Sequence, residues 1–128
     1  MSVPDDTDSY DLAKVPTIEQ YRAAFVACRA DMTDLDLAML EAHHRAPDHT
    51  VTATQLAEAV GLANFSAANL HYGTYASRLC TVLGRAPRIF VAILVRFSCG
   101  DQPGDEITWT MLPEVVSALE QMRWVRPR

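Results

Sequence analysis

Three capping boxes mark the starts of three helices along this chain. In such a box, a Thr side chain accepts a hydrogen bond from the backbone three residues on, and the side chain there returns one. The pairs are Thr17 with Gln20, Thr33 with Asp36, and Thr52 with Gln55. These signals favour a fold built from short, packed helices, each beginning at a defined residue.

The middle of the chain continues this pattern. Pro47 is expected to stop the second helix near Arg45. Residues 50–52 are β-prone, and Gly61 closes the third helix. A longer helix is expected at 66–83.

The helix at 66–83 is amphipathic. Ser66 is a good N-cap candidate and Gly84 is the expected stop. Tyr72 and Tyr75 fall on the apolar side of the helical wheel and are expected in the core. Gly73 is unfavourable inside a helix and hints that another backbone approaches closely there.

A β-hairpin and a last helix complete the chain. Residues 88–98 and 106–111 are rich in β-formers and flank the turn sequence CGDQPGD. Pro113 fits the first turn of a C-terminal helix. The predicted fold class is mainly α with a small β-hairpin, a winged helix-turn-helix with an extra N-terminal and C-terminal helix.

Composition limits the domain organisation. The 128 residues are 49% hydrophobic and 21% charged, which suits one globular domain. Residues 1–16 carry four aspartates and are expected to be a flexible acidic leader, with the domain at 17–128. The longest apolar run, 89–95, is too short to span a membrane, and the start of the chain lacks a secretory signal, so we expect a cytoplasmic protein.

The charge pattern permits nucleic-acid binding although the net charge is −5. Residues 59–100 contain no acid and four arginines, which predicts a basic face. Double-stranded DNA is the predicted partner, with the helix in the major groove and the arginines on phosphates. The predicted DNA-binding residues are Ser66, Asn69, Leu70, His71, Thr74, Ser77, Arg78, Arg85, Arg88 and Arg96.

Catalytic and metal sites are not expected. His43, His44 and His49 with Asp48 could suggest a metal, but their spacing is poor and a solvated helix end is favoured. The cysteines, Cys28, Cys80 and Cys99, are interpreted as reduced and mostly buried thiols. We therefore predict no enzyme activity, no cofactor and no metal.

The run TATQLAEAVGLANFSAANLHYGTYASRLCTVLG resembles a module found upstream of the nuclease domain in some bacterial HNH endonucleases, including modification-dependent restriction enzymes. The later WTMLPEVVSALEQMRWV is similar to the ending of that module, so the resemblance covers roughly residues 33–125. The HNH nuclease residues have no counterpart here. The resemblance implies a stand-alone recognition or adaptor module, with Asn64, Asn69, Tyr72 and Gly73 at the matching positions.

Two further interpretations remain open. The apolar run 89–95 is expected either to be buried on both faces or to pair with another chain, because an exposed edge of this kind would aggregate, so a homodimer through this strand is plausible. The alternative function is a protein-protein interaction module of the same fold, an accessory or inhibitor protein in a phage-host defence setting. The global negative charge favours this alternative over DNA binding.

Overall fold

A computed structural model describes residues 15–85 and 91–126. The chain is mainly helical with a small three-stranded antiparallel sheet. In chain order the elements are α2 (Ile18–Cys28), η2 (Arg29–Asp31), α3 (Asp34–Arg45), η3 (Pro47–His49), β1 (Thr50–Thr52), α4 (Ala53–Val60), α5 (Phe65–Leu83), β2 (Val95–Ser98), β3 (Thr108–Met111) and α6 (Pro113–Gln121). The predicted leader, residues 1–16, lies almost wholly outside the described residues.

All three capping boxes are confirmed. The Thr17 hydroxyl accepts from the Gln20 amide at 3.1 Å, and the Gln20 side chain accepts from the Thr17 amide at 2.8 Å. The same reciprocal pair forms at Thr33 and at Thr52. These bonds satisfy amides that the first turn of a helix leaves without a partner, which is why α2, α3 and α4 start where the sequence predicts.

Helix α5 begins one residue earlier than predicted. Asn64, not Ser66, is the N-cap, and its side-chain oxygen accepts from the Ala67 amide at 3.0 Å. Asn and Ser are equally good N-cap residues, so the residue types alone could not show which of the two begins the helix. The predicted stop is confirmed, because Gly84 is left-handed at φ 73°.

The apolar run forms much less strand than predicted. Residues 91–93 make a 3-10 turn and only Val95–Ser98 pairs as strand β2, while residues 86–90 lie outside the described residues. Residues 92–95 are buried within the monomer. The described part of the run is therefore core, which is the first of the two alternatives that the sequence allowed, and its side chains need no second chain to cover them.

The sheet has the order β1-β3-β2. Val51 lies opposite Trp109 in β3, and Trp109 lies opposite Phe97 in β2. One face of the sheet packs Trp109 against Tyr72 of α5, with ring centroids 5.8 Å apart. Both predicted core tyrosines, Tyr72 and Tyr75, are buried.

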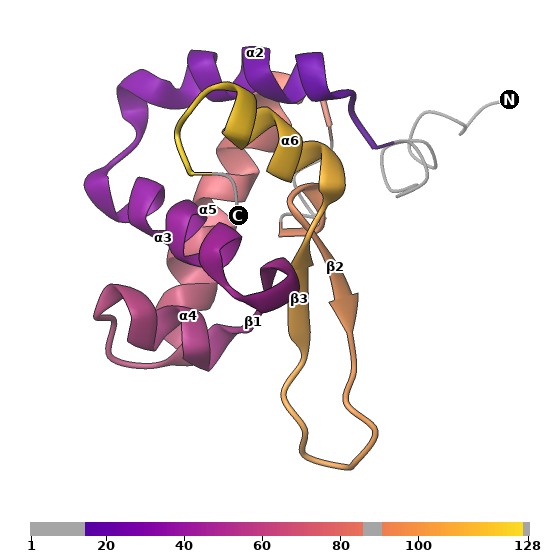
Figure 1. The fold of residues 1–128 in the computed structure, drawn as a ribbon. Helices are drawn as coiled ribbons and strands as arrows, with labels where there is room; N and C mark the ends of the chain where they lie inside the picture. The colour runs from indigo at the N-terminus through magenta and orange to yellow at the C-terminus, as the bar shows by residue number, and fades with distance from the viewer. Residues whose placement is uncertain (1–14, 86–90, 127–128) are drawn as a thin grey trace, which may run out of the picture.

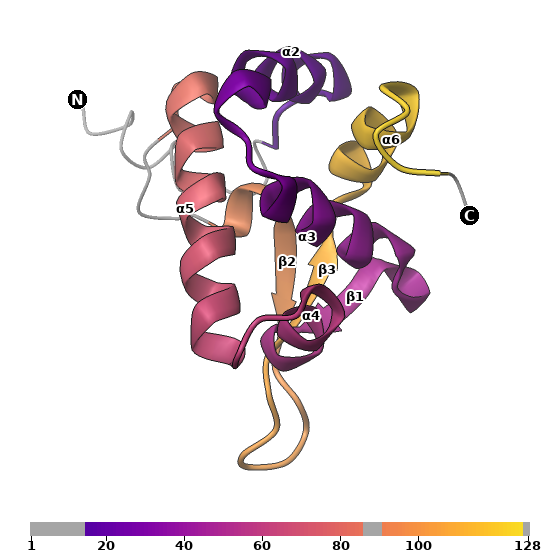
Figure 2. The same ribbon diagram turned by 90° about the vertical axis from the view of Figure 1, so that its left-hand side faces the viewer.

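The elements collect at two ends of the molecule. Helices α2 and α6 lie together at one end, while α4, the start of α5 and the hairpin loop lie at the other (Figures 1 and 2). The tail is anchored as predicted, since Val125 is buried and Trp124 packs against Phe25 at 5.5 Å. None of the described helices combines the length and apolar character that a membrane span needs.

Candidate interaction surface at the start of helix α5

The first half of α5 presents an exposed face. Ser66, Asn69, His71 and Thr74 are exposed, and Leu70 is the most open apolar side chain on this helix at 67% exposure. Ser77 is half-buried. The six predicted contact residues on this part of α5 thus lie largely outside the core.

Phe65 belongs to the same surface but was missed by the sequence prediction. It is 52% exposed in the first turn of α5, directly after the Asn64 cap. The prediction had placed it before the helix, where a Phe usually packs as a staple against the core. Phe65 and Leu70 lie five residues apart in the same helix and together expose apolar area that a partner could cover.

The hairpin loop, residues 99–107, lies at the same end of the molecule (Figure 2). The carboxylate of Glu106 accepts from the Thr54 amide at 3.1 Å and from its hydroxyl at 2.9 Å, which ties the loop to the start of α4. Within the loop the Asp105 carboxylate accepts from the Gln102 amide at 2.9 Å. We call α4, residues 65–77 of α5 and this loop the loop end.

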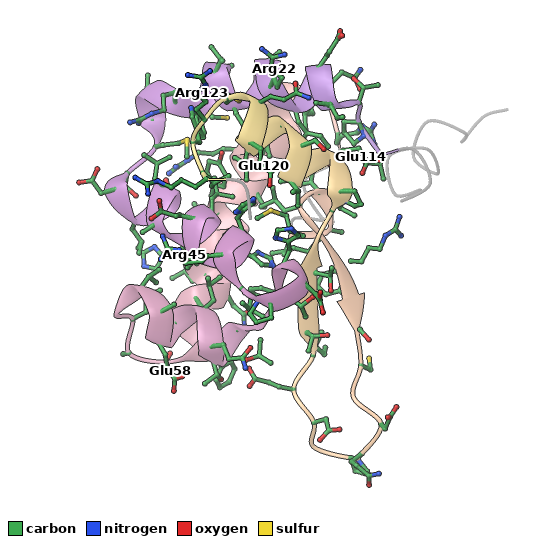
Figure 3. All side chains as sticks on the ribbon, in the orientation of Figure 1. Arg22, Arg45, Glu58, Glu114, Glu120 and Arg123 are labelled. Carbon is green, nitrogen blue, oxygen red and sulfur yellow. The ribbon has the colours of Figure 1, made fainter. Side chains whose placement is uncertain are left out.

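The loop end is acidic. Its charged residues are Glu58, Asp101, Asp105 and Glu106, and residues 46–77 and 97–122 contain neither lysine nor arginine. Figure 3 places Glu58 at this end, and Arg22 and Arg123 at the opposite one. The sequence predicts a basic β-hairpin with Arg88 and Arg96, but its described part, residues 95–111, holds one arginine and three acids.

The predicted phosphate-binding arginines do not gather into one patch. Arg78 is held toward α3, where its guanidinium lies 3.7 Å from the Asp36 carboxylate and donates to the Asp31 carbonyl at 3.5 Å. Arg85 follows the C-terminal cap of α5, at the far end of the helix, and Arg96 is exposed on β2. Arg88 lies outside the described residues.

A buried hydrogen-bond network holds the inner face of α5. His43 of α3 contacts the Tyr72 hydroxyl through Nδ1 at 2.7 Å and the Trp109 carbonyl through Nε2 at 2.9 Å. Because a carbonyl only accepts, Nε2 carries the proton and Nδ1 accepts from Tyr72. Burial lowers the pKa of His43 from 6.5 to about 4, so this neutral form persists near neutral pH.

The second histidine of α3 is also buried. His44 Nε2 donates to the Glu120 carboxylate of α6 at 2.7 Å, and its carbonyl accepts from His49 Nδ1 at 2.6 Å. The prediction of a solvated helix end is therefore wrong for His43 and His44, because β3 and α6 cover this end of α3. The histidines serve as structural links between elements.

Metal and thiol chemistry find little support in the described residues. Across residues 15–85 and 91–126, no group of three or more His, Cys, Asp or Glu side chains is placed to hold a metal ion. Burial raises the pKa of the Cys28 thiol, and that of Cys80 to about 11, which keeps both thiols protonated. Cys99 is exposed in the hairpin loop.

Comparison with known proteins gave no match: no family model, no curated protein and no solved structure is significantly similar to this chain. The resemblance to the module of HNH endonucleases thus stays a prediction from the sequence.

Proposed function

We propose that the chain is a non-catalytic protein-interaction module that binds its partner through the loop end. Phe65 and Leu70 form the apolar centre of the contact, and the acids of α4 and the hairpin loop form its rim. The observation that carries this proposal is the absence of any lysine or arginine from residues 46–77 and 97–122.

The charge of the loop end supports a protein partner over DNA. Binding to DNA is driven by lysine and arginine side chains that displace counterions from phosphates. Four carboxylates and no arginine or lysine would instead repel the phosphate backbone. The same charges favour a protein surface in which lysines or arginines surround an aliphatic or aromatic pocket.

Gly73 supports a contact on this side of α5. Its φ is not in the left-handed region, and among the described residues no atom lies within 4 Å of the place where a Cβ would stand. The glycine thus costs roughly 1 kcal/mol of helix stability without serving the packing of the described monomer. A partner that approaches the helix closely would need this room, which would account for a glycine at position 73.

DNA recognition is the second candidate, favoured by the order of the elements. From α3 onward the order is helix, strand, helix, helix, strand, strand, and the sheet order is β1-β3-β2. This is the arrangement expected of a winged helix-turn-helix, in which α5 would enter the major groove. The exposed Ser66, Asn69, His71 and Thr74 offer hydrogen-bonding groups for base edges.

Affinity capture with the immobilised chain tests the first candidate. Wild type is compared with Leu70→Ser and with the matched control Val26→Ser, which alters an equally open apolar residue at the opposite end, 65% exposed. We expect one or more proteins bound by wild type and by Val26→Ser and reduced roughly tenfold by Leu70→Ser. A set of bound proteins that Leu70→Ser leaves unchanged contradicts the proposal.

Fluorescence anisotropy with a labelled duplex tests the second candidate. The expected result is no binding at about 50 mM salt, with methylated or unmethylated DNA. Binding that weakens steeply toward about 200 mM salt, and that is lost in Leu70→Ser, would establish DNA recognition instead.

A further inference from the structure

We propose that two copies of the chain associate through the open edges of strand β2, antiparallel and about a two-fold axis at Phe97. Apart from Cys99, which also belongs to the loop end, this inference uses a different part of the molecule from the proposed function, because neither α4 nor α5 is part of the contact.

The hydrogen-bond pattern shows which backbone groups of β2 face outward. The Leu112 amide donates to the Leu94 carbonyl at 2.9 Å, and these two residues continue the register that pairs Val95 with Met111. Bonded pairs alternate along an antiparallel ladder. The Leu94 carbonyl and the backbone groups of Arg96 and Ser98 therefore point to β3, while the Leu94 amide donates to the Val91 carbonyl at 2.8 Å. The backbone groups of Val95 and Phe97 point to the open edge, and the same alternation, continued one residue past the strand, would turn those of Cys99 the same way.

That edge has no strand partner among residues 15–85 and 91–126, since β2 is the outermost strand of the β1-β3-β2 sheet (Figure 1). Proteins usually protect such an edge with a very short strand, charged side chains, a proline or a bulge. Strand β2 has four residues, VRFS, and carries one charged side chain, Arg96, but no proline, and its outward-facing residue Phe97 is uncharged. An edge of this kind accepts a further strand.

A two-fold axis at Phe97 satisfies the outward groups. Phe97 then pairs with Phe97 of the second copy, and Val95 pairs with Cys99 of the second copy, so each bonded pair joins two outward-facing residues. The bonded pairs line up around one axis because Val95, Phe97 and Cys99 follow one another at intervals of two residues. The edge is thus complementary to itself, as a two-fold interface requires.

The side chains fit the same axis. Phe97 is 51% exposed and lies on the face that also carries Trp109, so the two Phe97 rings would cover each other. On the opposite face Arg96 would stand across from Ser98 of the second copy. The two arginines are therefore diagonal neighbours and do not stand directly opposite each other, where like charges oppose pairing most.

Phe97→Pro is the decisive variant. A proline removes the outward N–H and the ring without removing a bond to β3, and it is tolerated where the N–H of an edge strand faces solvent. In sedimentation equilibrium we expect wild type to dimerise as its concentration rises. The dimer dissociation constant of Phe97→Pro should be at least roughly tenfold higher than that of wild type. Wild type that stays monomeric at every concentration, or Phe97→Pro that dimerises as well as wild type, overturns the proposal.

Cross-linking tests the register and does not depend on how well the proline variant folds. In a Cys99→Ser background, Phe97→Cys places two thiols across the axis, with Cα atoms about 5.5 Å apart, within disulfide range. Ser98→Cys is the matched control, because its thiol would face Arg96 of the second copy. Mild oxidation should give a covalent dimer only with Phe97→Cys; equal yields from both variants, or no dimer from Phe97→Cys, overturn the two-fold axis at Phe97.

Discussion

Acidification should destabilise this protein through His43. The side chain is fully buried and neutral, donating to the Trp109 carbonyl and accepting from Tyr72. A proton can add only at Nδ1, the atom that faces the Tyr72 hydroxyl. The two histidines nearby, His44 and His49, disfavour a further positive charge there.

The size and sign of this loss of stability follow from the pKa of His43. Its folded value is about 4 and its ordinary value is 6.5. As the pH falls from about 6.5 to about 4, His43 becomes protonated in the unfolded chain but stays neutral in the folded chain, so the free energy of unfolding decreases. At about 1.4 kcal/mol per pH unit, the loss reaches about 3 kcal/mol near pH 4, a large share of the stability of a small domain. Above about pH 6.5 the contribution of His43 is constant.

Urea unfolding at several pH values measures this effect. The stability gap between wild type and His43→Gln should narrow by about 3 kcal/mol between about pH 7 and about pH 4, because the variant lacks the titrating group. His71→Gln, which removes an exposed histidine of α5, serves as the control and should track wild type. A gap for His43→Gln that stays constant across this range refutes the reasoning, because the burial of His43 would then carry no proton linkage.

Other substitutions test single contacts. Tyr75→Phe should raise stability by about 1 kcal/mol in chemical denaturation, because the buried Tyr75 hydroxyl has no hydrogen-bond partner among the described residues, whereas Tyr72→Phe should lower it by a similar amount. If both variants shift stability in the same direction, this account of the two hydroxyls fails. Gly73→Ala should raise the melting temperature by the equivalent of about 1 kcal/mol while weakening partner binding; unchanged binding would remove Gly73 from the proposed contact. Gly100→Ala should open the hairpin loop to proteases, because a Cβ there would collide with the Asp105 side chain, and a cleavage rate equal to that of wild type would contradict this.

The helix starts were predictable from the sequence because their signals are local. A capping box is complete within four residues, so the Thr17, Thr33 and Thr52 boxes formed as expected. The same locality explains the error at α5, where Asn64 and Ser66 are competing caps two residues apart. The apolar run beginning at Ile89 was harder to interpret, since such a run indicates burial and leaves the backbone conformation undetermined.

The electrostatics of the candidate surface depended on tertiary structure. The four arginines between Ala59 and Gly100 are close in sequence, but Arg78 is drawn to Asp36 of α3, Arg85 follows the end of α5, and Arg96 lies on β2. The acids of the hairpin loop, just after the acid-free window, come to lie beside α4 through the contact of Glu106 with Thr54. Counting charges along the chain could not predict which of them share a surface.

The burial of the two histidines of α3 has the same origin. His43 bonds to a carbonyl 66 residues away, and His44 bonds to a carboxylate 76 residues away. Nothing within α3 distinguishes these side chains from the solvated histidines that commonly follow a helix end. Only the return of β3 and α6 across α3 creates their partners.

The two faces of α5 therefore have separate roles. The inner face is fixed by Tyr72, through His43 to α3 and through ring packing to Trp109 of β3. On the outer face, the side chains of Phe65 and Leu70 make no such contacts among the described residues and remain exposed. The proposed contact with a partner would cover both side chains. Changes to the inner face should then alter stability, whereas changes to the outer face should alter binding alone.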